Sequence, residues 1–292
     1  MWLENGLNSK QIFTRLCLLF SLFFIFNLYL DQRVSLIFLG VVFSYCIWIA
    51  YQLLVKGFFI LLTTKKIGRA TYQVRSRFFP LNLSKSYREI ASAQLSGFAS
   101  RSAIFNSQGK NDLFFLEIIR DLTQSLSLKK ILILGGAGCS LASFFAKQKS
   151  IQNVDVIEYN PIMIELANKY FLKKNEKINL IHGNGLNYTK YCADIYDLVI
   201  IDMFDGPILK KGVINESFIR KVKKSITESG FFIMNLGYSK EINSVIKTWQ
   251  NFFSLYIYLS HSNFLISNIK CGSFKFNSSH RFLFEIPQLI ED

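Results

Sequence analysis

The chain has 292 residues, half of them hydrophobic, and its formal net charge is +14 at pH 7. This length gives room for one sizeable domain and a smaller part. Such a charge would suit a nucleic-acid partner, but no basic helix and no aromatic–basic RNA motif accompanies it, so none is expected. The five cysteines form no CxxC pair and show no histidine spacing for a metal. They predict free thiols in a reducing compartment and no metal site.

Two long apolar runs open the chain. Residues 12–30 contain few polar side chains, and residues 34–55 contain no charged one. Each run approaches the roughly 20 residues with which a helix crosses a bilayer. Basic residues are numerous after the second run, whereas the turn offers only Arg33, so the positive-inside rule places both termini in the cytoplasm. The sequence therefore predicts a two-pass membrane protein with a two-helix transmembrane hairpin over residues 1–64, and a pair of buried core helices is the alternative.

The character of the chain changes twice after this hairpin. Residues 65–111 are polar with short alternating runs, which predicts a small β-rich lead-in. From residue 112, a segment with helical spacing is followed by short apolar runs that alternate with helix-like segments. This alternation over residues 112–292 predicts an α/β domain with a Rossmann-like, doubly wound, mostly parallel sheet. The expected strands are residues 130–134, 154–157, 178–181, 198–201 and 231–235, with an antiparallel edge pair within 255–286.

The first of these strands ends in a loop of small residues. The loop reads Gly135-Gly136-Ala137-Gly138-Cys139. Small residues let a ligand lie against bare backbone where the chain turns into a helix. Because the loop fits the dinucleotide-binding pattern only in part, a tight structural turn is the alternative.

Polar side chains follow the next three strands, at the edge of the sheet where such domains bind ligands. Glu158 ends the second strand, where a carboxylate can accept hydrogen bonds from both hydroxyls of a ribose. Asn184 and Gly185 follow the third strand and predict a polar contact to an adenine edge and room for its ring. Asp202 and Asp205 follow the fourth, otherwise apolar, strand. The alternatives are a solvated loop acid for Glu158 and a helix cap or turn for the two aspartates.

These motifs together resemble the spermidine/spermine synthase family, the polyamine aminopropyltransferases, which share the Rossmann-like fold of class I methyltransferases. The resemblance runs from about residue 87 to residue 237. It is carried by Ile-Leu-Gly-Gly-Ala-Gly-Cys-Ser-Leu, Val-Ile-Glu-Tyr-Asn-Pro, His-Gly-Asn-Gly and Tyr-Asp-Leu-Val-Ile-Ile-Asp-x-x-Asp. It implies transfer of an aminopropyl group from decarboxylated S-adenosylmethionine, used as a co-substrate, to an amine such as putrescine, without a metal.

The resemblance also assigns roles to single residues. Asp202 matches the catalytic acid that holds the amine and takes its proton, and Asp205 matches a second acid at the amine site. Glu158 matches the acid that binds the ribose of the donor, and Glu117 is retained from the substrate-binding polar residues of the helix before the first strand. The other expected contacts to the donor are Gly135, Gly136, Ala137, Gly138, Asn184 and Gly185.

Three departures from the family pattern leave other activities open. The glycine loop lacks the aspartate that helps to select the decarboxylated donor, Asn184 replaces an adenine-binding aspartate, and the preceding helix keeps only Glu117. One alternative is a methyltransferase that uses ordinary S-adenosylmethionine. Another is a catalytically silent nucleotide-binding protein of the membrane. The expected partners are a small amine and the lipid bilayer, and a homodimer stays open.

Overall fold

The computed structural model of the chain describes residues 7–8, 14, 17–18, 21, 24–25, 32–51, 53–54, 58–67, 70–80, 87–93, 98–103, 119, 122–123, 126–136, 138–172, 175–191, 193–205, 208–237, 242–258, 263–267 and 283–286. The chain divides into two compact units, Met1–Asp112 and Leu113–Asp292. Glu117, Ala137 and the side chain of Asp205 lie outside the described residues, so the roles expected of them stay predictions.

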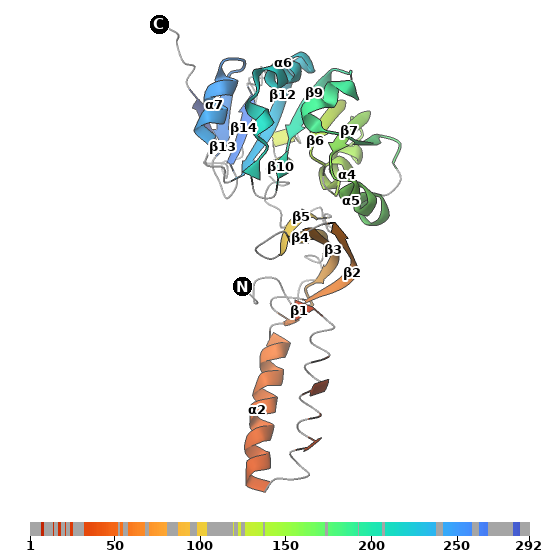
Figure 1. Cartoon of the computed structure of the whole chain (residues 1–292), viewed down its shortest axis with the longest axis vertical. Helices are drawn as coiled ribbons and strands as arrows, with labels where there is room; N and C mark the ends of the chain where they lie inside the picture. The colour runs from red at the N-terminus through yellow and green to blue at the C-terminus, as the bar shows by residue number, and fades with distance from the viewer. Residues whose placement is uncertain are drawn as a thin grey trace. The chain divides into compact units, whose positions relative to one another are not determined.

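The first unit contains a long helix and a five-stranded sheet (Figure 1). Its strands lie side by side in sequence order, and every pair from β2 to β5 is antiparallel. Strand β1 pairs in parallel with β2, and β2 runs across residue 64. The elements are β1 (Leu7–Asn8), α2 (Gln32–Tyr51), β2 (Phe58–Ile67), β3 (Ala70–Phe78), β4 (Tyr87–Ala93) and β5 (Phe98–Ala103).

The predicted two-pass membrane localisation is wrong. Within the described ranges, no helix is long and apolar enough to cross a membrane. Most of the first apolar run, residues 12–30, lies outside those ranges, and the second run becomes α2, which ends at Tyr51. Apolar side chains such as Val41 and Phe43 on α2 are more than half exposed. The prediction rested on the apolar character of the two runs alone, and the described residues of the first run form no continuous helix.

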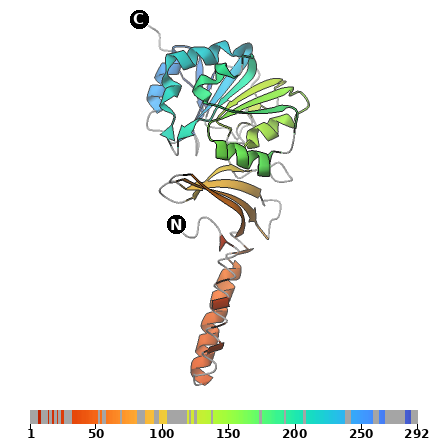
Figure 2. The ribbon, with the colours of Figure 1, turned by 45° about the vertical axis from the view of Figure 1, so that its right-hand side comes forward.

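The second unit is built on an eight-stranded sheet with the order β15-β13-β14-β12-β9-β6-β7-β8 (Figures 1 and 2). The five strands from β12 to β8 are parallel, and β13, β14 and β15 add an antiparallel edge. This arrangement confirms the predicted Rossmann-like, mostly parallel sheet. Its strands are β6 (Lys130–Leu134), β7 (Asn153–Glu158), β8 (Ile178–His182), β9 (Tyr196–Ile201), β12 (Ile226–Gly237), β13 (Leu255–Tyr258), β14 (Asn263–Ser267) and β15 (Leu283–Ile286).

The parallel strands are buried on both faces, as their continuous apolar sequences require. On one face, Leu132 and Leu134 belong to a core with Phe218 of α6 (Glu216–Lys224) and Trp249 of α7 (Ile242–Gln250). The rings of Phe218 and Trp249 pack edge to face. Alternate residues such as Ile131 point to the other face and are equally buried. The helical segments are α4 (Ser140–Ala146), α5 (Pro161–Leu166), the π-helical η3 (Ala167–Phe171), the 3-10 helices η4 (Gly185–Lys190) and η5 (Lys211–Ile214), α6 (Glu216–Lys224) and α7 (Ile242–Gln250). A short hairpin joins β10 (Phe204–Asp205) to β11 (Ile208–Leu209).

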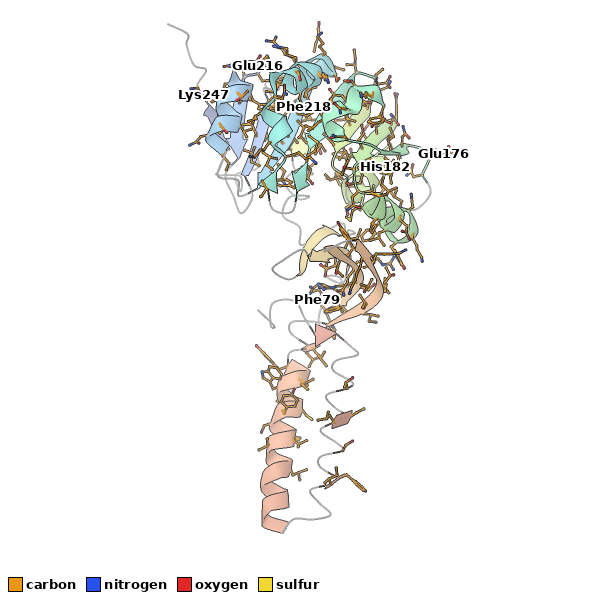
Figure 3. All side chains as sticks on the ribbon, in the orientation of Figure 1. Phe79, Glu176, His182, Glu216, Phe218 and Lys247 are labelled. Atoms are coloured by element: carbon orange, nitrogen blue, oxygen red, sulfur yellow. The ribbon has the colours of Figure 1, made fainter. Side chains whose placement is uncertain are left out.

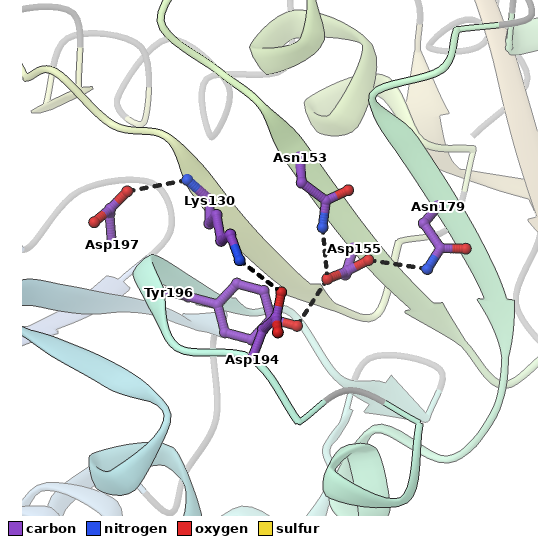
Figure 4. A network of polar contacts seen from close by, with 7 residues as sticks. All are labelled: Lys130, Asn153, Asp155, Asn179, Asp194, Tyr196 and Asp197. Carbon is purple, nitrogen blue, oxygen red and sulfur yellow. Dashed lines mark hydrogen bonds and ion pairs between the residues drawn. The ribbon is translucent and has the colours of Figure 1, made fainter.

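A buried aspartate connects the amino-terminal halves of three parallel strands (Figure 4). Asp155 on β7 accepts hydrogen bonds from Nδ2 of Asn153 at 2.9 Å, from Nδ2 of Asn179 on β8 at 3.0 Å and from the hydroxyl of Tyr196 on β9 at 2.7 Å. The acceptor-only carboxylate thus receives donors from its own strand, from the neighbouring β8 and from β9, which lies beyond β6. These bonds offset the cost of burying it.

The start of β6 is fixed to the same edge of the sheet by two further acids (Figure 4). Oδ2 of Asp197 accepts the backbone N–H groups of Lys129 at 2.7 Å and Lys130 at 3.0 Å. Nζ of Lys130 forms an exposed ion pair with Asp194 at 2.8 Å, and this partner raises the pKa of the lysine. The amino-terminal edge is therefore rich in polar contacts that hold the strands in register.

Candidate active site

The loops that follow β6, β7 and β9 meet at the carboxyl-terminal edge of the sheet. The backbone N–H of Gly135 donates to the carbonyl of Ile157 at 2.9 Å, and that of Asp202 donates to the carbonyl of Leu134 at 2.8 Å. The N–H of Gly183, after β8, donates to the carbonyl of Glu158 at 3.0 Å. The structure thus brings the glycine loop, Glu158 and Asp202 together at the edge where sheets of this kind bind ligands.

The glycine loop requires its glycines because neighbouring strands approach it closely. Gly135 has φ +92°, and a Cβ there would overlap the carbonyl oxygen of Asp202. A Cβ on Gly136 would overlap a methyl group of Val156. The loop then turns through Cys139, which is buried at φ 60° and precedes α4. Burial, together with the charge of Glu158, raises the pKa of this thiol to about 12. The thiol therefore stays protonated at neutral pH and is a poor nucleophile.

Glu158 is buried at the end of β7 and is held in place by the start of the next helix. Its Oε1 accepts the backbone N–H of Asn160 at 2.8 Å. Asn160 in turn accepts the N–H of Ile162 at 3.0 Å and caps α5, which begins at Pro161. Proline suits this first helical position. The sequence Glu-Tyr-Asn-Pro therefore fixes the carboxylate at the edge of the sheet.

Asn184 and Gly185 have structural partners that the sequence did not predict. Oδ1 of Asn184 accepts the N–H of Leu186 at 3.1 Å and caps η4, so the amide group Nδ2 is the part of this side chain not committed to the cap. A Cβ on Gly185 would come within 2.6 Å of Sδ of Met203. Gly185 thus lets the chain after β9 pack against η4, in addition to any contact with a ligand.

Asp202 follows β9 and is paired with an asparagine of the neighbouring strand. Nδ2 of Asn235, near the end of β12, donates to Oδ1 of Asp202 at 2.9 Å. The pKa of Asp202 is raised from 3.8 to about 6, mainly by burial. The hydrogen bond from Asn235 opposes this rise, and the charge of Glu158 adds to it. Sequence reasoning missed Asn235, although a polar residue at the end of the apolar run from Phe231 was a usable signal.

The side chains that could bind a metal are scattered in the described part of the chain. Among the residues that the structure describes, no group of three or more His, Cys, Asp or Glu side chains could hold a metal ion. His182 ends β8 and lies exposed, with Nε2 3.1 Å from the carbonyl oxygen of Tyr159 (Figure 3).

The second unit has a mostly parallel sheet, and acids stand at the ends of its second and fourth strands, counted along the chain from β6. This arrangement defines a Rossmann-like domain with its ligand site at the carboxyl edge. Within this class, the family model of the spermine/spermidine synthase domain matches residues 103–269. That match covers more than half of the chain, and the chain belongs to this family. The family predicted from the sequence motifs is therefore confirmed.

Individual relatives agree with this assignment. A polyamine aminopropyltransferase of Buchnera aphidicola subsp. Acyrthosiphon pisum is 29% identical over 132 residues, which cover 43% of this chain and 46% of the relative. The chain thus spans about half the length of the curated relatives it matches. A probable spermidine synthase of Corynebacterium glutamicum has a similar structure, with a TM-score of 0.59 at 13% identity over 70% of this chain and 79% of that one. The spermidine synthase of Thermotoga maritima has a TM-score of 0.52 at 15% identity, over 72% and 74% of the two chains.

Proposed function

We propose that the chain transfers an aminopropyl group from decarboxylated S-adenosylmethionine to a small amine such as putrescine. One observation carries this proposal. Glu158 and Asp202 follow the two strands on either side of β6, and they are close enough for the charge of one to raise the pKa of the other. An acid at the end of β7 suits the ribose of the donor, and an acid after β9 suits the amine that attacks its sulfonium.

Glu158 binds the ribose in this proposal. Its carboxylate is anchored by the N–H of Asn160, so the acceptor lone pairs face a fixed direction. Gly135 and Gly136 let the loop lie against Asp202 and Val156, which keeps the loop close to both acids. Glu158 selects a ribose with free hydroxyl groups, because a phosphate there would meet its charge.

Asp202 is the base in this proposal. The amine nitrogen attacks the methylene carbon next to the sulfonium, the carbon–sulfur bond breaks, and the electron pair stays on sulfur as a neutral thioether. The attacking nitrogen loses one proton, which Asp202 accepts. With its pKa near 6, Asp202 is mostly ionised at neutral pH and yet is a stronger base than an exposed aspartate.

Methyl transfer from ordinary S-adenosylmethionine is the second candidate. It is favoured by the loop from Gly135 to Cys139, which contains no acid to bind the ammonium group of a decarboxylated donor. Methyl transfer needs little beyond proximity and orientation of the two reactants. In that case, the donor preference of the protein is reversed, while the ribose contact through Glu158 is the same.

The two candidates are separated by donor binding and by product mass. The purified full chain is titrated by calorimetry with each donor, and products with putrescine or spermidine are weighed by mass spectrometry. Aminopropyl transfer predicts tighter binding of the decarboxylated donor, an aminopropylated product, and a loss of at least roughly a hundredfold in kcat in Asp202→Asn. Asp194→Asn, at the other edge of the sheet, is the matched control and keeps full activity.

A methylated product would instead establish the second candidate. If neither donor binds, both activities are excluded and the protein is catalytically silent. Full activity in Asp202→Asn would remove Asp202 from the mechanism while leaving the transfer itself intact.

A further inference from the structure

We propose that Asn235 is a positioning residue that holds the Asp202 carboxylate in the orientation in which it receives the amine. This inference rests on the proposed function for its role in catalysis. Its geometric basis is the pairing of two parallel strands, in which Met234 of β12 lies beside Ile201 of β9. The next residues along the two strands are Asn235 and Asp202, and their side chains are joined at 2.9 Å.

The orientation of the Asn235 amide is fixed from its other side. The backbone N–H of Gly237 donates to Oδ1 of Asn235 at 2.9 Å. A backbone N–H only donates, and an ionised carboxylate only accepts. The amide therefore has to place its oxygen toward Gly237 and its NH2 group toward Asp202, since the flipped amide would lose both bonds. The result is a short relay from Gly237 through Asn235 to Asp202.

The backbone of β12 is shaped for this relay. The pairing of β12 with β14 is regular up to Asn235, and its register shifts between Asn235 and Gly237. Gly237 has φ +56°, and a Cβ there would come within 3.0 Å of the ring of Phe204. Such irregularities in a strand redirect side chains and are common beside active sites. Here the irregularity turns the N–H of Gly237 back onto its own strand's asparagine.

The relay has two consequences for Asp202. One carboxylate oxygen, Oδ1, is engaged by Asn235, which leaves Oδ2 as the oxygen that meets the amine. The bond also favours the ionised carboxylate, opposing burial and the charge of Glu158 on β7. Cys139, another titratable group near Glu158, stays neutral in the working pH range because its pKa is raised. Asn235 is therefore placed to set both the direction and the basicity of this acid.

The inference is tested by the pH profile of the full-length enzyme. In Asn235→Ala the acidic limb of kcat/KM shifts upward by about one pH unit, and kcat falls roughly tenfold to a hundredfold. In Asn235→Asp the limb shifts further, because a second carboxylate faces Asp202. Donor affinity measured by calorimetry changes less than about twofold, since Asn235 contacts the acid and not the nucleoside end of the site. A purely structural role of Asn235 would not shift the acidic limb upward in the order wild type, Asn235→Ala, Asn235→Asp.

Asn179→Ala is the matched control, because Asn179 also donates to a buried aspartate, Asp155, but at the opposite edge of the sheet. It lowers stability and leaves the acidic limb unmoved. An unchanged limb in Asn235→Ala would overturn the inference while the transfer activity stands.

A second measurement keeps the inference separate from the proposed function. The aspartate carboxyl groups are labelled with carbon-13, and the signal of Asp202 is assigned by its absence from Asp202→Asn. An NMR titration of this signal then gives the pKa of Asp202 in the wild-type chain and in Asn235→Ala. A higher pKa of Asp202 in the variant supports the relay even if no amine is turned over. Equal pKa values in the two proteins would overturn it whatever the enzyme does.

Discussion

Gly135 lies directly against the backbone of Asp202. A Cβ on Gly135 would overlap the carbonyl oxygen of Asp202 and lie 2.8 Å from its carbonyl carbon. The N–H of Asp202 is meanwhile bonded to the carbonyl of Leu134, one residue earlier. The glycine loop and the proposed base are thus held together by backbone alone, so neither can shift without the other.

Gly135→Ala should lower the free energy of unfolding by about 2–4 kcal/mol, because the side chain meets rigid backbone and φ is positive. Donor affinity should fall as well, since the loop and Asp202 have to separate. Urea unfolding followed by the fluorescence of the buried Trp249 measures the first effect. The comparison variant is Gly212→Ala, whose Cβ would meet the end of the flexible Leu186 side chain instead of backbone, and it should cost about 1 kcal/mol. Equal losses in the two variants would contradict this account.

The parallel part of the fold was predictable because its strands are short apolar runs with small or polar residues at their ends. Lys130–Leu134 was expected as a strand with the bounds that β6 has. The positions of Glu158 and Asp202 at one edge follow from the parallel arrangement, in which all strands end on the same side. Their roles still depend on the proposed function.

The contact between Asn235 and Asp202 was not predictable in the same way. It depends on β12 lying next to β9 and on the register shift before Gly237, and neither has a local signal in the sequence. The capping role of Asn184 was missed because the sequence was read only for contacts to a ligand. The membrane prediction rested on the apolar runs alone, and no helix among the described residues is long and apolar enough to cross a membrane.

Tyr196→Phe should lower the free energy of unfolding by about 1–3 kcal/mol. The variant removes one of the donors to the buried carboxylate of Asp155, and no water can replace it without cost. Thermal or urea unfolding checks the effect, and donor binding at the opposite edge should be unchanged. Tyr191→Phe is the control, because Tyr191 is exposed. If both variants are as stable as the wild type, the Asp155 bonds contribute nothing measurable.

Cys139 should resist alkylation as long as the protein is folded. With its pKa raised to about 12, only roughly one molecule in ten thousand carries the thiolate at pH 8. Iodoacetamide labelling followed by peptide mass spectrometry should therefore modify the exposed Cys17 much faster than the buried Cys139. In urea, Cys139 should become reactive. Rapid labelling of Cys139 in the folded protein would show that the glycine loop opens readily.

Asp202 should make the stability of the protein fall as the pH rises from about 4 to about 6. Burial raises its pKa from 3.8 to about 6, so between these values the folded state binds more protons than the unfolded chain. Asp202→Asn removes this effect, and the variant should gain up to about 3 kcal/mol relative to the wild type between pH 4 and pH 7. Comparing urea unfolding at the two pH values cancels any constant effect of the new amide. Parallel changes in the two proteins would mean that the pKa of Asp202 is not raised.

The polar contacts around Asp155 and the proposed base Asp202 lie at opposite ends of the same strands. A substitution at the carboxyl edge leaves the contacts of the amino edge in place, and so leaves the sheet in register. Side chains at the carboxyl edge can therefore vary, away from close backbone contacts such as that of Gly135, at little cost to the scaffold. A departure such as an acid missing from the glycine loop is the kind of change that this separation permits, and a family built on such a sheet has freedom to acquire new substrates.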